Sequence, residues 1–226
     1  MSIPRPLANL RFGVIGPGRV GSSLATWIAQ RGGRLEAWVR RSPGPAPYHR
    51  EFPRRNRREL TEIPSVPLDL LLLCVPDWEI AGVAAALGPI TAHVALHVSG
   101  SRTAAVLAPL RGRGAAVGSF HPLWAFAARV ARPPRGLTAG VDGDAAALTV
   151  ARRLATAFGA QAFEIPPEAR LIYHLAASLA AGGVATVAAS AAALTRAQGL
   201  PEQLGEGFRS LAGSALAGLA SPRLDA

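Results

Sequence analysis

The sequence contains no lysine, so all 24 of its basic side chains other than histidine are arginines, and the formal net charge is +10. Without lysine the chain can neither form a Schiff base with a carbonyl compound nor use an ammonium group as a general acid. Proton chemistry in this protein must therefore depend on His, Tyr, Cys, a carboxylate, a hydroxyl group or water.

Cysteine is almost absent too. The single Cys74 cannot form an intramolecular disulfide, which fits a reducing compartment. Its position in the apolar run VPLDLLLLCV indicates a small core residue rather than a nucleophile. The first twelve residues, MSIPRPLANLRF, contain no apolar leader segment, so we expect a cytoplasmic protein.

Nucleic-acid and metal sites are not expected. The arginines gather between residues 40 and 58, in a proline-rich segment without a nucleic-acid-binding module or interleaved aromatic residues. We therefore expect a solvated loop, part of which binds a cofactor phosphate. The five histidines are scattered and the lone cysteine has no partner, so no metal centre is predicted.

The strongest motif is RFGVIGPGRVGSSL, residues 11–24. An apolar strand leads into a G-x-G-x-x-G turn, and a helical pattern follows, which is the setting that dinucleotide binding requires. The three glycines permit a tight turn, close approach of a diphosphate and close helix packing, and the amino end of the helix attracts the anion. The predicted pyrophosphate-binding residues are Gly16, Pro17, Gly18, Arg19, Val20 and Gly21.

Up to about residue 166, short apolar strands alternate with helices, which predicts an α/β fold. We expect a doubly wound, mostly parallel Rossmann sheet over residues 9–166 and a small all-α domain over residues 167–226. Strands are predicted at 12–15, 35–39, within 66–75, and at 94–98, 115–120, 137–141 and 162–165. Helices are predicted at 22–30, 80–87 and 144–158, the last capped by Asp142 or Asp144, and residues 58–63 fit a helical turn or a weak strand.

Residues 171–195 contain no charged side chain. On length alone they could span a membrane, but they are mostly Ala, Gly, Ser and Thr, whose transfer to lipid gains little. We therefore expect no membrane partner, and instead a helix covered by its neighbours or by a second subunit, kinked or broken at Gly182-Gly183. One more helix is predicted at 202–219.

The end of the second predicted strand indicates which dinucleotide binds. NAD sites usually have Asp or Glu there, about 20 residues past the glycines, whereas Glu36 comes too early. Arg40, Arg41 and Ser42 instead suit a 2′-phosphate, so we expect NADP. The alternative is that the arginines only make the strand end soluble.

Other candidates follow the later strands, because ligands of such sheets bind beyond the carboxyl ends of the strands. Val75-Pro76 and Ser99-Gly100 are expected against the cofactor, although the second pair equally fits a plain turn. Asp77 is predicted to cap the next helix.

His121, in the segment GSFHPL, is the main catalytic candidate, because it ends a strand where it could donate a proton or hold a carbonyl, carboxylate or imine group. The alternative is a histidine that fixes the turn before Pro122. Tyr173 and His174 open the long helix, and each either reaches a substrate or makes a structural contact between domains.

Several segments occur in a familiar succession: GVIGPGRVGSSLA, LLLLCVPD, HVSGS, GSFHPLWAFA and ARLIYHLAASLA. In these the chain resembles Rossmann-like bacterial proteins that carry a C-terminal helical domain of unknown function. Those proteins are similar to pyrroline-5-carboxylate reductase, the deazaflavin-dependent NADP reductases and the 6-phosphogluconate dehydrogenase-like superfamily. The resemblance covers nearly all of residues 10–200, and it implies NADP binding, pairing of subunits through the helical domain and an oxidoreductase role. The chain differs from this family at Gly182, where the family tends to have Asn. It also lacks the lysine that related hydroxyacid dehydrogenases use on the equivalent helix.

These observations predict an NADP-dependent oxidoreductase that transfers a hydride between the nicotinamide and a small carbonyl, imine or hydroxy compound in an interdomain cleft. A homodimer formed through the C-terminal helices is expected. The alternative is a non-catalytic NADP-binding sensor or scaffold protein whose helical domain binds a partner, which the missing lysine and Gly182 favour.

Overall fold

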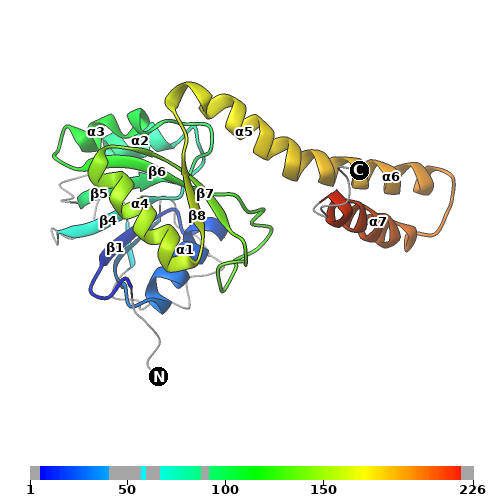
Figure 1. Ribbon diagram of the computed structural model, residues 1–226, viewed down its shortest axis with the longest axis horizontal. Helices are drawn as coiled ribbons and strands as arrows, with labels where there is room; N and C mark the ends of the chain where they lie inside the picture. Colours follow the sequence, from blue (N-terminus) through cyan, green and yellow to red (C-terminus); the bar gives the residue numbers. More distant parts are fainter. Residues whose placement is uncertain (1–5, 41–56, 60–66, 88–91, 220–226) are drawn as a thin grey trace. The chain divides into compact units, whose positions relative to one another are not determined.

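The computed structural model describes residues 6–40, 57–59, 67–87 and 92–219 (Figure 1). The chain forms two compact units, Met1–Tyr173 and His174–Ala226. The domain limits expected from the sequence, 9–166 and 167–226, stay a prediction.

The first unit is built on one eight-stranded sheet with the strand order β3-β2-β1-β4-β5-β6-β7-β8. Strands β1 to β6 are all parallel to one another, whereas β7 is antiparallel to β6, and β8 is parallel to β7. The strands are β1 Arg11–Ile15, β2 Arg34–Arg40, β3 Arg57–Glu59, β4 Leu68–Leu73, β5 Ala92–His97, β6 Ala116–Pro122, β7 Thr138–Gly143 and β8 Gln161–Glu164. The predicted doubly wound, mostly parallel α/β fold is thus confirmed.

Helices cover both faces of the sheet, because its central strands are apolar on both sides. Helices α1 (Arg19–Gln30) and α4 (Ala145–Phe158) pack on one face, against side chains such as Phe12 and Leu70. Helix α2 (Ile80–Ala86) packs on the other face with the short helices η3 (Ala104–Leu107) and α3 (Ala108–Arg111), against side chains such as Leu71. The sequence did not predict η3 and α3, since each is only four residues long.

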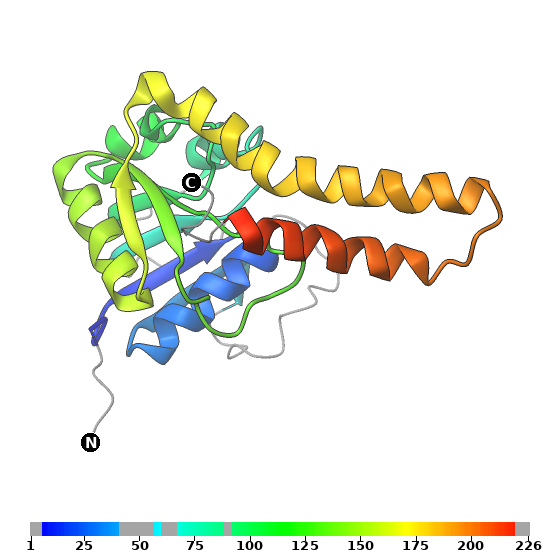
Figure 2. The same ribbon diagram turned by 45° about the vertical axis from the view of Figure 1, so that its right-hand side comes forward.

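The segment between β6 and β7 runs along α1 (Figure 2). The Trp27 indole N–H donates to the Val130 carbonyl at 2.8 Å, and the Val130 N–H donates to the Ser23 hydroxyl at 2.8 Å. Arg19, in the glycine turn, donates to the Ala127 carbonyl at 3.3 Å. These bonds hold the chain that follows His121 against the helix that begins at the glycine turn.

The second unit contains most of α5 (Arg170–Ser178), a π-helical stretch over Leu179–Gly183, α6 (Val184–Ala197) and α7 (Leu204–Leu219). Gly182 and Gly183 therefore lie in a π turn within a continuous helical run, where a kink or break was predicted. Helices α6 and α7 lie side by side (Figures 1 and 2).

Within the described chain, the helix Pro167–Ala197 is long and apolar enough to cross a membrane by length and composition, with a mean hydropathy of 1.6 over an 18-residue window, which is weak evidence by itself. Among the described residues after Arg170, only Gly205 is buried. This helix is therefore exposed in the single chain, and its cover by neighbouring helices or by a second subunit stays a prediction.

Candidate active site

The glycine turn joins β1 to α1 at the carboxyl edge of the parallel strands. Gly16 has φ +85°, and a Cβ atom there would lie 2.5 Å from the carbonyl oxygen of Cys74. Both facts require glycine at this position. The Gly16 N–H donates to the Val39 carbonyl at 3.1 Å, which holds the end of β2 beside the turn.

The amino end of α1 is open to an anion. Gly18 is the N-cap residue, and a Cβ atom there would meet nothing within 4 Å. No side chain caps α1, and its first turn contains no acidic residue. Gly21 is buried, and a Cβ atom there would overlap the carbonyl oxygen of Gly16. Uncapped amides and the positive end of the helix dipole favour a phosphate, so this turn fits the diphosphate of a dinucleotide.

Only part of the predicted 2′-phosphate site is described. Arg40 ends β2, next to the glycine turn, whereas Arg41 and Ser42 lie outside the described residues. Glu36 lies inside β2, and its carboxylate pairs with Arg34 at 3.5 Å. It therefore occupies an earlier position than an acidic residue that binds ribose would, as predicted.

The start of the β4 loop lies against the turn. A Cβ atom on Gly16 would come within 2.9 Å of Val75 Cγ1, so Val75 and Pro76 follow β4 beside the predicted diphosphate site. Burial raises the pKa of the Cys74 thiol to about 12. This side chain is therefore protonated at neutral pH, which supports its interpretation as a packing residue.

The carboxylate of Asp77 joins the loops that follow β4 and β5. Its Oδ2 accepts hydrogen bonds from the hydroxyls of Ser99 and Ser101, each at 2.7 Å. Helix α2 instead begins after Glu79, without a side-chain cap, so the predicted capping role of Asp77 is wrong. The Ser99 hydroxyl also accepts the N–H groups of Ser101 at 3.2 Å and Arg102 at 3.1 Å, and it thereby shapes the loop.

His97, which the sequence analysis did not single out, is a buried residue whose imidazole binds the backbone of the loop after β5. Its Nδ1 accepts the Ser99 N–H at 3.2 Å, so Nε2 carries the proton and donates to the Thr103 carbonyl at 3.1 Å. Burial lowers the pKa of His97 to about 4, although the negative charge of Asp142 acts in the opposite direction. The imidazole is therefore neutral at pH 7.

His121 and Tyr173 are brought together by β6 and α5. The Tyr173 hydroxyl lies 2.8 Å from His121 Nδ1, and the two rings meet edge to face at 5.5 Å between centroids. Gly140 lies opposite His121 on β7, and a Cβ atom there would overlap the Tyr173 hydroxyl. Burial raises the pKa of Tyr173, whereas Arg170 and the Gly140 backbone lower it. His174 begins the second unit, and its catalytic role stays a prediction.

Arg170 is a second residue that the sequence analysis missed. Its side chain is 1% exposed. One guanidinium nitrogen pairs with Asp142 Oδ1 at 2.9 Å and donates to the Ser119 hydroxyl, and another donates to the Gly100 carbonyl at 3.5 Å. The guanidinium carbon lies 5.9 Å from the centroid of the Tyr173 ring. The only signal in the sequence is that this arginine stands directly before the long uncharged run.

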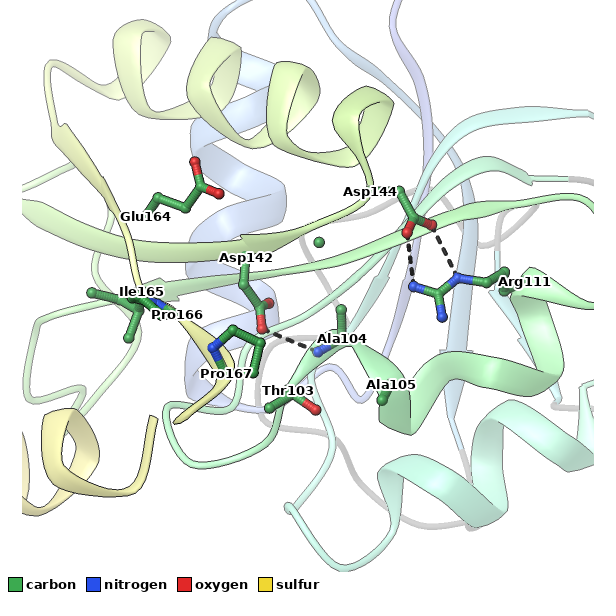
Figure 3. Close-up of a pocket in the computed structure, with 11 residues that line it drawn as sticks. Thr103, Ala104, Ala105, Arg111, Asp142, Asp144, Glu164, Ile165, Pro166 and Pro167 are labelled. Atoms are coloured by element: carbon green, nitrogen blue, oxygen red, sulfur yellow. Dashed lines mark hydrogen bonds and ion pairs between the residues drawn. The ribbon is translucent and has the colours of Figure 1, made fainter. Parts of the chain in front are cut away.

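A cavity of about 340 Å³ is lined by Asp142 and Asp144 and by residues from η3, α3 and the end of β8 (Figure 3). Asp142 Oδ2 accepts the Ala104 N–H at 3.2 Å, and Asp144 accepts two bonds from Arg111, at 2.7 and 3.2 Å. The cavity is lined by Thr103, Ala104, Ala105, Arg111, Asp142, Gly143, Asp144, Glu164, Ile165, Pro166 and Pro167. Among the described residues, no group of three or more His, Cys, Asp or Glu side chains could hold a metal ion.

Sequence comparison agrees with this geometry. The model of a Rossmann-like domain matches residues 4–122, and the model of DUF2520, a domain of unknown function, matches residues 137–225. No protein with a curated description matches the chain by sequence.

Solved structures share the fold at low sequence identity. A protein from Bacteroides fragilis assigned as an NADP oxidoreductase is 16% identical, with a TM-score of 0.75 over 93% of this chain and 82% of that one. Protein TM1727 from Thermotoga maritima is 19% identical, with a TM-score of 0.70 over 93% and 79%. Pyrroline carboxylate reductase from Plasmodium falciparum, solved with NADP bound, is 14% identical, with a TM-score of 0.62 over 95% and 80%. At these identities the likeness establishes the fold.

The resemblance inferred from the sequence motifs is therefore confirmed in its family and its architecture. The geometry of the glycine turn, the order of the strands and the residues matched by the family model all indicate a Rossmann-like domain. The chain belongs to the Rossmann-like domain family, and a DUF2520 domain follows in its C-terminal part.

Proposed function

We propose that the protein is an NADP-dependent oxidoreductase, which transfers a hydride between the nicotinamide and a small carbonyl, imine or hydroxy compound. The observation that carries this proposal is the glycine turn, in which Gly16 has φ +85° and Gly18 opens onto empty space at an uncapped helix. The B. fragilis protein and the NADP-bound reductase from P. falciparum share the fold and support the choice of cofactor.

The residues present fit this cofactor. When bound, NADP supplies or accepts the hydride at nicotinamide C4. The amides of Arg19, Val20 and Gly21 would hold its diphosphate, because they begin α1 without a side-chain cap. The other residues proposed to bind it are Arg40, Arg41 and Ser42 at the 2′-phosphate, and Val75, Pro76, Ser99 and Gly100 along its length.

Proton transfer is proposed for the Tyr173–His121 pair. With the Tyr173 hydroxyl donating to Nδ1 at 2.8 Å, a neutral His121 carries its proton on Nε2. During reduction, Nε2 gives that proton to the oxygen or nitrogen of the substrate while the substrate carbon gains the hydride. The Tyr173 proton passes to Nδ1 in the same step, so His121 stays neutral, and the Tyr173 phenolate takes a proton back from water. The double bond has then gained one hydride and one proton. This reaction forms no covalent intermediate with the enzyme, and His121 serves as the general acid, so no lysine is needed.

We also propose a cytoplasmic homodimer formed through the second unit. Large apolar side chains on α5, the π-helical stretch, α6 and α7 are exposed in the single chain, and they would need cover in water. They are Leu171, Ile172, Leu175, Leu179, Val187, Leu194, Leu204, Leu211 and Leu216. The abundant Ala, Gly and Ser residues between them favour close helix-to-helix contact over lipid. Sedimentation of the purified protein without detergent would show a dimer, whereas a stable monomer would contradict the proposal.

The proposed activity is tested by screening carbonyl, imine and hydroxy compounds for oxidation of NADPH or reduction of NADP. Turnover with at least one compound class is expected, together with tighter binding of NADPH than of NADH in fluorescence titrations. Binding of NADPH without turnover on any class would favour a sensor or scaffold protein. Equal or tighter binding of NADH would overturn the assignment of the 2′-phosphate residues.

A further inference from the structure

We propose that Arg170 is a positioning residue for the Tyr173–His121 pair: its buried ion pair with Asp142 holds the first turn of α5 on β6 and β7, and thereby keeps the Tyr173 hydroxyl at His121. This inference rests on the proposed function, which gives the pair its role in proton transfer. It concerns a residue that does not touch the reacting atoms and that meets the predicted cofactor site only at the Gly100 carbonyl.

The side chain of Arg170 is held in place by its buried polar partners. A buried guanidinium is strongly unfavourable unless its charge and its N–H groups are paired. Arg170 meets Asp142 of β7 at 2.9 Å, the hydroxyl of Ser119 on β6 and, at 3.5 Å, the Gly100 carbonyl in the loop after β5. Asp142 is held in turn by the Ala104 N–H at 3.2 Å. Two strands and one loop therefore hold this side chain through its two terminal nitrogens, whereas its Nε–H has no hydrogen-bond partner among the described residues.

The position of Tyr173 depends on that of Arg170, because both residues lie on helix α5. Residues three apart lie on the same face of a helix, and the guanidinium carbon is 5.9 Å from the Tyr173 ring centroid. The ring then enters the space that Gly140 leaves open and reaches His121 Nδ1 at 2.8 Å. A shift of the first turn of α5 would therefore break the contact between Tyr173 and His121.

The charge of Arg170 also suits the proposed chemistry. When Tyr173 gives its proton to His121 it becomes a phenolate, and a nearby positive charge favours that state. Arg170 already acts on the pKa of Tyr173 in this direction, against the larger effect of burial. The charged and titratable groups described around Tyr173 are Arg170 on α5, His121 on β6 and Asp142 on β7. Glu164 of β8 is paired with Arg152 of α4 instead, at 2.7 Å.

The same arginine reaches the loop predicted to meet the cofactor. Gly100, whose carbonyl it binds, stands between Ser99 and Ser101, and Asp77 holds both of these hydroxyls at 2.7 Å. Arg170 thus ties the proposed proton donor and the loop after β5 to one buried group. This gives the arginine directly before the uncharged residues 171–195 a structural role.

The test follows the ionisation of Tyr173 and needs no cofactor or substrate. The chain has two tyrosines, so Tyr48→Phe leaves Tyr173 as the only phenol, whose tyrosinate is measured by ultraviolet absorbance during a pH titration. In this background, Arg170→Gln with Asp142→Asn removes both buried charges, so no unpaired charge remains in the core. Arg170→Lys keeps the charge but loses the planar fork. Arg152→Gln removes an arginine from an exposed ion pair and serves as the control.

We expect the acidity constant of Tyr173 to fall about tenfold in the double variant and about threefold in Arg170→Lys, and to stay unchanged in Arg152→Gln. A folded double variant with an acidity constant within about twofold of the parent protein overturns the proposal. If the double variant does not fold, Arg170→Lys decides by the same criterion. The titration of Tyr173 contains no NADPH. If the protein fails to bind NADPH in the separate fluorescence titration, the effect of Arg170 on Tyr173 can still be measured.

Discussion

The Tyr173 hydroxyl reaches His121 Nδ1 at 2.8 Å because the residue opposite His121 on β7 is Gly140. A Cβ atom at that position would lie 2.6 Å from the ring carbon that carries the hydroxyl. The contact between the two side chains therefore depends on a third residue that has none. This relationship connects strand register to the proposed proton donor.

Gly140→Ala should destabilise the protein by about 1–3 kcal/mol, because the added methyl group overpacks the Tyr173 site. Tyr173→Phe should remove part of this penalty when the two changes are combined, since the phenol oxygen is one of the overlapping atoms. Urea unfolding of the two single variants and the double variant measures the coupling. Strictly additive effects would show that Tyr173 does not occupy the space beside Gly140. Gly82→Ala is the control, because a Cβ atom at Gly82 meets nothing within 4 Å.

His121→Ala should lower turnover by about 100-fold or more, since it removes the proposed general acid. The affinity for NADPH should stay within about twofold, because the diphosphate site is formed by the separate turn after β1. Steady-state kinetics on a substrate found by screening, with NADPH titration of the same sample, checks both parts. Unchanged turnover would leave His121 with only its alternative role, which is to fix the turn before Pro122.

Arg40→Gln should weaken NADPH binding about tenfold and leave NADH binding nearly unchanged, because only NADPH carries the 2′-phosphate. Arg34→Gln is the matched control, since Arg34 begins the same strand and pairs with Glu36 at 3.5 Å. Fluorescence titration of both variants with both dinucleotides gives the comparison. An equal loss for NADH and NADPH would mean that Arg40 does not recognise the extra phosphate.

His97 should make the stability of the protein depend on pH. Its pKa is about 4 in the folded chain and about 6.5 without burial, so the unfolded state binds more protons between these values. The stability that a neutral His97 provides is complete above about pH 6.5, and it is lost progressively as pH falls toward 4. His97→Gln should flatten this dependence in urea unfolding at pH 7 and pH 5, whereas a change at the exposed His93 should not. An unchanged slope in His97→Gln would contradict the buried neutral state.

Much of the sheet is readable from the sequence, because most of its strands are short apolar runs and the glycine spacing is local, whereas β3 consists of charged residues only. The reversal of β7 was not predicted, since an apolar run does not record strand direction. One signal was available: no helical pattern separates β6 from β7, and a parallel connection needs a crossover that usually contains a helix. The short helices η3 and α3 were missed because a four-residue helix shows no periodicity.

The side chains of the site were less predictable than the backbone. Asp77 was expected to cap α2, but Ser99 and Ser101, more than 20 positions away, bind its carboxylate instead. Arg170 was overlooked for the same reason, since Asp142, Ser119 and Gly100 meet it only after the sheet has formed. Residues whose role depends on their own turn, such as Gly16, could be identified, whereas residues whose partners are distant could not.

NADPH titration of Gly18→Glu tests the proposed diphosphate site most directly. A side chain at Gly18 meets no protein atom within 4 Å, so the variant should fold normally, while its carboxylate would occupy and repel the diphosphate position. Gly82→Glu places the same side chain at an equally open glycine on α2 and serves as the control. NADPH affinity should fall by about tenfold or more in Gly18→Glu and stay unchanged in Gly82→Glu, with equal melting temperatures. A Gly18→Glu protein that binds NADPH as tightly as the parent would contradict the central claim, that this turn is the cofactor site.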